Sequence, residues 1–277
     1  MKKQYKPTET RDDVKTYRRI RNMIGFLGMG LPLVLFVISC IHFFETPPQP
    51  SISDYYYTNC REIFTGVLCA VGLFLIRYQG HTNEVFWKND KLMTNIAGTM
   101  ALGVALMPTN PITCAEKIYT FLPICAPWTG AIHYLFAATF FLILANISVN
   151  VFVIGQKKSP DIPVYLFNEN YIYRTCGFVI FICIVLIPIC MKLELFPRST
   201  YWLETVALLS FGFSWLIKGR AFGQNGLMGR ILYRENNKTS DKENPRAVLR
   251  FLISVPRRLR LLAEIEERKR KAFGSQR

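Results

Sequence analysis

The segment Ser51–Tyr78, SISDYYYTNCREIFTGVLCAVGLFLIRY, joins a polar, tyrosine-rich loop directly to a long apolar run. The run Ile63–Ile76 holds a single hydroxyl side chain, that of Thr65, among apolar and small residues. A helix that crosses a hydrocarbon layer of about 30 Å needs about 20 apolar residues, with roughly 17 to 25 tolerated. The segment therefore predicts a membrane-spanning helix that begins at a polar boundary, and it makes that boundary the first place to look for a site.

The composition places the whole chain among membrane proteins. Apolar residues make up 51% of the 277 residues, and the mean hydropathy is +0.19. The apolar residues are concentrated in six blocks that are long enough, or nearly so, to cross a membrane. The sequence thus predicts an all-α fold, a polytopic membrane bundle of six transmembrane helices. The predicted spans lie near Met23–Phe44, Glu62–Tyr78, Leu92–Pro108, Gly130–Ile154, Ile172–Met191 and Tyr201–Leu216.

Basic residues gather at the two ends of the chain. Met1–Asn22 holds eight Lys and Arg against three acidic residues, and Lys218–Arg277 holds sixteen against six. Because Lys and Arg are retained on the cytoplasmic side of a membrane, both termini are predicted to be cytoplasmic, which requires an even number of spans. The loop between the fifth and sixth spans, with Lys192 and Arg198, is the one exception to this charge pattern.

The charge pattern divides the chain into a basic cytoplasmic arm over 1–22, a transmembrane domain over 23–217, and a basic cytoplasmic tail over 218–277. Anionic inner-leaflet headgroups attract basic residues by about 1 kcal/mol each, so they are expected partners of both termini. Acid-to-base pairs beside an apolar side predict an amphipathic helix near 246–272 in the tail, which either lies under the membrane or binds a protein partner. No nucleic acid is expected as a partner, because no reading motif accompanies the charge.

Two further features concern packing and covalent structure. Ala97, Ala101 and Ala105 recur at four-residue spacing, which predicts a central helix packed closely on several neighbours. Cys114 and Cys125 lie in the longest outer loop, where oxidation is favoured. We expect them to form a disulfide that closes a loop of about eleven residues, worth roughly 2–3 kcal/mol. Cys40 and Cys60 lie on the same side of the membrane and are competing partners.

Three ionisable groups are predicted to lie at one depth of the membrane. Glu62 begins the second span at its outer end, and His133 and Glu204 each lie about one turn into a span from the same side. Ionisable groups in spans are costly, so they usually face the bundle or a wet cavity. We therefore expect a polar pocket near the outer leaflet. Its candidate ligand-binding residues are Ser53, Asp54, Tyr55, Arg61, Glu62, Asn110, His133 and Glu204.

The chemistry of this pocket has several interpretations. In one, the ionisable groups are structural, and Glu62 pairs with Arg61 or His133 and satisfies helix ends. Lipid headgroup binding or membrane scaffolding is the favoured function, and the three tyrosines at Tyr55–Tyr57 form either a headgroup-level belt or a collar around a ligand. Alternatively, Glu62, His133 and Glu204 are metal ligands and catalytic residues of a metal-dependent, membrane-embedded lipid hydrolase. A divalent metal is the cofactor that this alternative needs, and no HxxxH, GxSxG or HExxH pattern accompanies it. A third alternative is a transporter or channel whose polar path reaches Asn95, Asn146 and Asn150.

The run ISDYYYTNCREIF, the small-residue span ending in MPTN and the fourth span with His133 near its start resemble a family of uncharacterised bacterial six-span membrane proteins. More distantly, Ser53 and Asp54, followed by Glu62, are similar to the Frag1/DRAM/Sfk1-like group. The resemblance covers roughly Ile24–Phe152. It implies six spans in a bacterial inner membrane and a role in lipid remodelling or membrane traffic, with Ser53, Asp54 and Glu62 as the positions carried over.

Overall fold

The computed structural model describes residues 11–111, 120, 126–153 and 169–222, all within one compact unit, Met1–Tyr233. These residues form helices joined by turns and loops, and they include no strand, so the predicted all-α class is confirmed for them. The α-helices are α1 (Arg11–Cys40), α2 (Arg61–Arg77), α3 (Asp90–Leu106), α4 (Pro127–Asn146), α5 (Glu169–Leu193) and α6 (Ser199–Lys218). Shorter segments are the 3₁₀ helices η1 (His42–Phe44), η2 (Ser53–Tyr57) and η3 (Phe86–Lys88), and the π-helix η4 (Ile147–Val151).

Within the part of the chain that the structure describes, three helices are long and apolar enough to cross a membrane. Their candidate spans are Thr16–Cys40, Trp128–Val151 and Glu169–Leu193. Helices α2 and α3 have 17 residues each, about 25 Å at 1.5 Å per residue, which is short of a 30 Å hydrocarbon layer. The sequence-based span near 62–78 nevertheless matches α2 to within one residue at each end.

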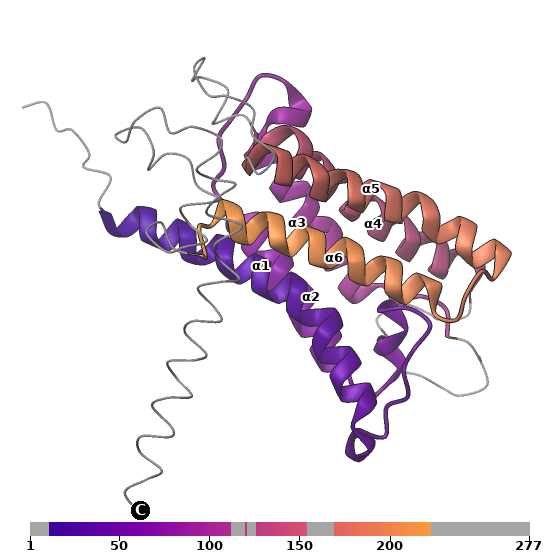
Figure 1. The fold of residues 1–277 in the computed structure, drawn as a ribbon. Helices are drawn as coiled ribbons and strands as arrows, with labels where there is room; N and C mark the ends of the chain where they lie inside the picture. The colour runs from indigo at the N-terminus through magenta and orange to yellow at the C-terminus, as the bar shows by residue number, and fades with distance from the viewer. Residues whose placement is uncertain (1–10, 112–119, 121–125, 154–168, 223–277) are drawn as a thin grey trace, which may run out of the picture. The chain divides into compact units, whose positions relative to one another are not determined.

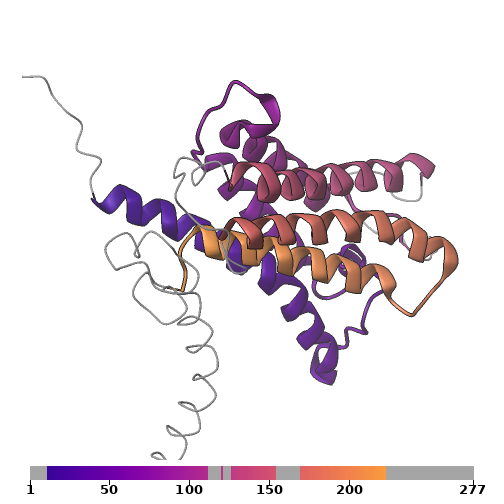
Figure 2. The same ribbon diagram turned by 45° about the horizontal axis from the view of Figure 1, so that its top comes forward.

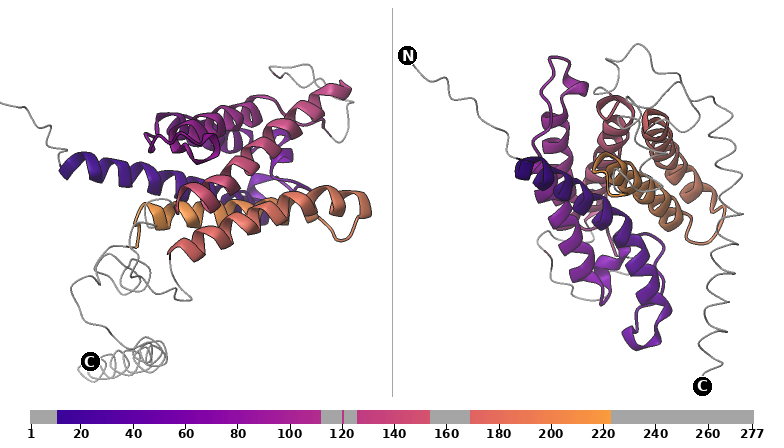
Figure 3. Two further views of the ribbon diagram at one scale, coloured as in Figure 1. Left: turned by 90° about the horizontal axis from the view of Figure 1, so that it is seen from above. Right: turned by 60° about the vertical axis from the view of Figure 1, so that its left-hand side comes forward.

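The six α-helices pack in chain order. Each contacts the helix before and after it, and α6 returns to α1, which closes the set. Figures 1 and 2 show α6 lying between α1 and α5. The first turns of α1 reach past the neighbouring helices (Figures 1 and 3). The basic arm predicted over 1–22 is helical from Arg11 onward. Lys and Arg are good helix formers, and the same helix continues into the apolar span.

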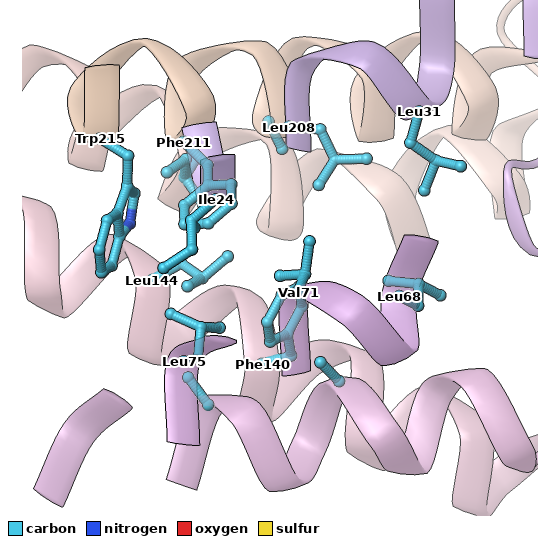
Figure 4. Packing of buried hydrophobic residues seen from close by; sticks show 14 of the residues in the cluster. Ile24, Leu31, Leu68, Val71, Leu75, Phe140, Leu144, Leu208, Phe211 and Trp215 are labelled. Atoms are coloured by element: carbon cyan, nitrogen blue, oxygen red, sulfur yellow. The ribbon is translucent and has the colours of Figure 1, made fainter. Parts of the chain in front are cut away.

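The core between the helices is apolar. Figure 4 shows Leu31 of α1, Leu68 and Val71 of α2, Phe140 of α4 and Leu208 of α6 directed toward one another. The predicted small-residue stripe of α3 is confirmed as a packing face, since Ala97, Ala101 and Ala105 are fully buried. Burial of this kind lets backbones approach: a Cβ placed on Gly98 of α3 would lie 2.5 Å from the carbonyl oxygen of Gly72 in α2.

Polar contacts tie the helices together at both ends of the bundle. We call these ends the Ser53 end and the Asp90 end. At the Asp90 end, the Tyr78 hydroxyl accepts hydrogen bonds from Arg21, at 3.1 Å from Nε and 2.7 Å from Nη2, and donates to Asp90 at 3.2 Å. The Lys218 ammonium donates to the carbonyl oxygen of Phe152 at 2.8 Å. The first set of contacts joins α1, α2 and α3, and the second joins α6 to the segment after η4.

Three predictions concern residues outside the described ranges. The disulfide between Cys114 and Cys125 lies outside them, as do the amphipathic helix near 246–272 and its partners. The described cysteines, Cys40, Cys60, Cys69, Cys176, Cys183 and Cys190, are free thiols.

Candidate functional site

The centre of the Ser53 end is the imidazole of His133, near the start of α4. Its Nδ1 lies 2.6 Å from the carbonyl oxygen of Met107, just after α3, and its Nε2 lies 3.0 Å from the hydroxyl of Ser53, the first residue of η2. A carbonyl oxygen can only accept, so Nδ1 carries the hydrogen and the neutral ring presents a lone pair at Nε2. The Ser53 hydroxyl then donates to Nε2. Both side chains are buried, His133 at 2% and Ser53 at 8% exposure.

Asp54, the next residue in η2, is held by the loop before it. One carboxylate oxygen accepts hydrogen bonds from the Ser51 backbone N–H at 3.1 Å and from the Ser51 hydroxyl at 2.7 Å. The other lies 3.5 Å from the Thr109 hydroxyl. Burial raises the pKa of the Asp54 carboxyl, and the hydrogen bonds from Ser51 and Thr109 oppose this rise. Asp54 thus fixes the shape of the loop that presents Ser53.

Glu204, one turn into α6, holds the same loop from the opposite side. Its carboxylate accepts a hydrogen bond from the backbone N–H of Ile52 at 2.7 Å. The Tyr201 N–H donates to the carbonyl oxygen of Pro50 at 3.0 Å, and the Tyr201 hydroxyl donates to that of Pro32 at 2.7 Å. The loop is therefore anchored to α6, and Tyr201 in turn joins α6 to α1.

The tyrosines of η2 are part of the protein interior. Tyr55 is 1% exposed and its hydroxyl lies 2.6 Å from that of Ser39, while Tyr56 is 5% exposed. The Tyr57 hydroxyl donates to the carbonyl oxygen of Thr109. Neither a headgroup-level belt nor a ligand collar describes Tyr55 and Tyr56, because their rings pack against helices and their hydroxyls bond to protein. Tyr55 therefore supports the loop from within the protein.

The remaining sequence-derived candidates are Arg61, Glu62 and Asn110. Arg61 donates to the Tyr56 hydroxyl at 2.5 Å, and its guanidinium lies 4.2 Å from the centre of that ring. Glu62 and Asn110 are exposed, and the Asn110 amide lies 3.4 Å from the carbonyl oxygen of Ala126. The described ranges contain no group of three or more His, Cys, Asp or Glu side chains that could hold a metal ion. The structure therefore does not bring Glu62 together with His133 and Glu204 as a metal centre.

A small cavity lies beneath the loop, between the helices. Its volume is about 30 Å³, and its polar lining comes from Ser53 and Glu204. A cavity of this size has room for about one water molecule. The rest of its lining is apolar and includes one or more side chains from each of five helices, among them Leu31, Phe64, Val104, Phe140 and Leu208.

An open groove of about 480 Å³ lies at the turn between α5 and α6, on the other side of the same loop. Glu194, Arg198 and Ser199 contribute its polar lining, and Met191 and Phe196 are among its apolar residues. Sequence reasoning did not select this groove. The sequence did contain a signal for it: Arg198 is a basic residue in the one predicted outer loop that departs from the charge pattern.

Comparisons of the chain with protein-family models, with curated proteins and with solved structures found no match. The resemblance to the Frag1/DRAM/Sfk1-like group therefore stays a prediction. Of its three positions, Ser53 is buried and Asp54 half-buried at the Ser53 end, and Glu62 lies exposed at the start of α2.

Proposed function

We propose that the protein is a six-helix protein of the bacterial inner membrane that binds a phospholipid at the Ser53 end. In this proposal the Ser53 end faces the outer leaflet and both termini are cytoplasmic. The charge distribution supports that orientation, because the two terminal segments carry most of the excess of Lys and Arg. The short helices α2 and α3 fit a bilayer that thins locally around them, at a modest cost per ångström.

The observation that carries the proposal is the groove at the turn between α5 and α6. It combines a cation, an anion and apolar surface in about 480 Å³. Arg198 and the amino-terminal end of α6, which starts at Ser199, favour a phosphate, because both a guanidinium and a helix amino terminus attract anions. Glu194 suits an ammonium group, and Met191 and Phe196 suit an acyl chain. A phospholipid with an amine in its headgroup has all three features.

The test measures retained phospholipid. The full chain, purified in a mild detergent, is analysed by native mass spectrometry and by quantitative extraction of its lipids. The unmodified protein is expected to retain phospholipid, and Arg198→Gln to retain roughly tenfold less, because a charge-assisted contact of about 1.4 kcal/mol corresponds to a factor of ten.

Lys192→Gln is the matched control for this experiment. Lys192 is a basic residue of α5 just before the same turn, but its side chain does not line the groove. This variant is expected to retain lipid like the unmodified protein. Equal retention in Arg198→Gln and in the unmodified chain would overturn the proposal, as would the same loss in Lys192→Gln.

A further inference from the structure

The geometry at His133 is that of a proton acceptor aimed at a hydroxyl group. The carbonyl of Met107 holds Nδ1–H at 2.6 Å, which fixes the ring orientation and leaves Nε2 as the acceptor. Nε2 lies 3.0 Å from the Ser53 oxygen, within the range at which a histidine removes a proton from a serine nucleophile. The orienting group is a backbone carbonyl, in the place that a carboxylate takes in a serine–histidine–aspartate triad.

The surroundings of this pair suit a reaction on a lipid. Ser53 also lines the cavity of about 30 Å³, whose other polar residue is Glu204. Apolar side chains from five helices surround the remainder. A serine nucleophile, room for about one water molecule and an apolar wall therefore meet at one point.

We propose that Ser53 and His133 are the nucleophile and general base of an acyl-ester hydrolase that acts on membrane glycerolipids. The proposal rests on the proposed lipid binding, since it takes the phospholipid of the α5–α6 groove as the substrate class. It assigns the groove to the headgroup and an acyl chain, and the cavity beside Ser53 to the water molecule of the hydrolysis. The loop from Pro50 to Ser53 borders both the groove and the cavity.

The reaction has two balanced steps. In the first, Ser53 loses its proton to Nε2 of His133 and its oxygen attacks the ester carbonyl carbon. The bond to the glycerol oxygen breaks, and Nε2 returns the proton to that oxygen, which leaves as the alcohol of a lysolipid. In the second, a water molecule gives a proton to Nε2 and its oxygen attacks the acyl carbon. Ser53 leaves and regains the proton, and a fatty acid is released.

Glu204 acts as a positioning residue in this scheme. Its carboxylate fixes the backbone N–H of Ile52, the residue before Ser53, and it lines the cavity in which the water of the second step is held. Among the hydrogen bonds of the described residues, none joins Glu204 to Ser53 or His133. Glu204 therefore positions the loop and the water, and it does not orient the imidazole.

A purely structural role for the pair makes a different prediction. A buried histidine that only satisfies two neighbours would not make Ser53 more reactive than any other buried hydroxyl. The reactivity of Ser53 therefore separates the two roles. A fluorophosphonate measures it directly, because an activated serine oxygen displaces fluoride from phosphorus and keeps the phosphonyl group as a permanent mass increase.

The experiment treats the full chain in detergent with a fluorophosphonate and locates the adduct by peptide mass spectrometry. The same samples are tested for release of fatty acid from a fluorogenic phospholipid. The expected result is one adduct, on Ser53, and a turnover that Ser53→Ala abolishes. His133→Asn keeps an amide donor for the Met107 carbonyl but lacks Nε2. The rates of Ser53 labelling and of fatty-acid release are therefore expected to fall at least roughly 100-fold. The unfolding midpoint of this variant is expected to stay close to that of the unmodified protein.

Ser148→Ala is the matched control, because Ser148 is also a buried serine, but it lies in η4 and its hydroxyl is 3.2 Å from that of Ser214. It is expected to leave labelling of Ser53 unchanged. An unlabelled Ser53 in the unmodified protein, or equal labelling in His133→Asn, would overturn the dyad. If the protein retains phospholipid but shows neither label nor turnover, the dyad is overturned and the proposed lipid binding stands. If label and turnover are found but Arg198→Gln retains as much lipid as the unmodified protein, the dyad stands and the groove is not the lipid site.

Discussion

Glu204 accepts a hydrogen bond from the backbone N–H of Ile52 at 2.7 Å, across 152 residues of sequence. This contact joins α6 to the loop that carries Ser53. Ile52 is 4% exposed, so its N–H has no access to bulk water. A buried donor that loses its acceptor costs about 1–3 kcal/mol.

The first prediction follows from this contact. Glu204→Ala is expected to lower the free energy of unfolding by about 1–3 kcal/mol, because the Ile52 N–H is left unsatisfied. Glu204→Gln is expected to cost less, since its amide oxygen can still accept. Thermal unfolding followed by tryptophan fluorescence in detergent measures both. Glu194→Ala, an exposed glutamate at the same end, is the control, and a loss as large there as in Glu204→Ala would contradict the assignment.

The helix positions near Ser51–Tyr78 could be predicted because they follow from an apolar run with polar ends. Helix α2 covers Arg61–Arg77, against a predicted span of Glu62–Tyr78. The buried face of α3 followed from the four-residue spacing of its alanines. Both features are local, and periodicity and length encode them directly.

The pairings within the site could not be predicted. The position of each residue within its predicted span placed Glu62 at the same membrane depth as His133. Depth does not fix which side of a helix a residue occupies, because each step along a helix turns the side chain by about 100°. Glu62 lies exposed, while Phe64, two residues later, is buried. The partners of Glu204 and His133 include the Ile52 N–H and the Met107 carbonyl, and backbone groups carry no sequence signature.

The second prediction concerns the Asp90 end. Tyr78→Phe is expected to lower the free energy of unfolding by about 1.5–3 kcal/mol, because it removes the hydroxyl that joins Arg21 to Asp90. The other carboxylate oxygen of Asp90 is buried and already has no hydrogen-bond partner among the described residues. Denaturant titration of the purified protein measures the change. Tyr17→Phe removes an exposed hydroxyl, bonded to Gln79 at 3.2 Å, and is expected to change little.

The third prediction uses two glycines of neighbouring helices. Gly98→Ala is expected to destabilise the bundle by about 1–3 kcal/mol, because the added Cβ would lie 2.5 Å from the Gly72 carbonyl oxygen and the helices would have to separate. Gly66→Ala is the matched control, since no atom lies within 4 Å of its added Cβ. That variant is expected to be neutral or more stable by up to about 1 kcal/mol, through helix propensity. Equal unfolding midpoints for the two variants would contradict the close packing of α2 on α3.

The last prediction is a dependence of stability on pH at Asp54. Burial raises the pKa of this carboxyl in the folded protein above its ordinary value of 3.8. Between 3.8 and the raised value, the folded state holds a proton that the unfolded state has released. Raising the pH through this window therefore lowers the free energy of unfolding, and the contribution of Asp54 is most favourable below pH 3.8.

Asp54→Asn removes the titrating proton and keeps an oxygen that can accept from Ser51. Its unfolding midpoint, measured between pH 3.5 and 7, is expected to fall less with rising pH than that of the unmodified protein. Asn59→Ala changes an exposed side chain that does not ionise, in the same segment, and is expected to leave the slope unchanged. If Asp54→Asn and the unmodified protein gave parallel curves, the Asp54 carboxyl would titrate alike in the folded and unfolded chains. The loop that presents Ser53 would then leave this carboxylate in water.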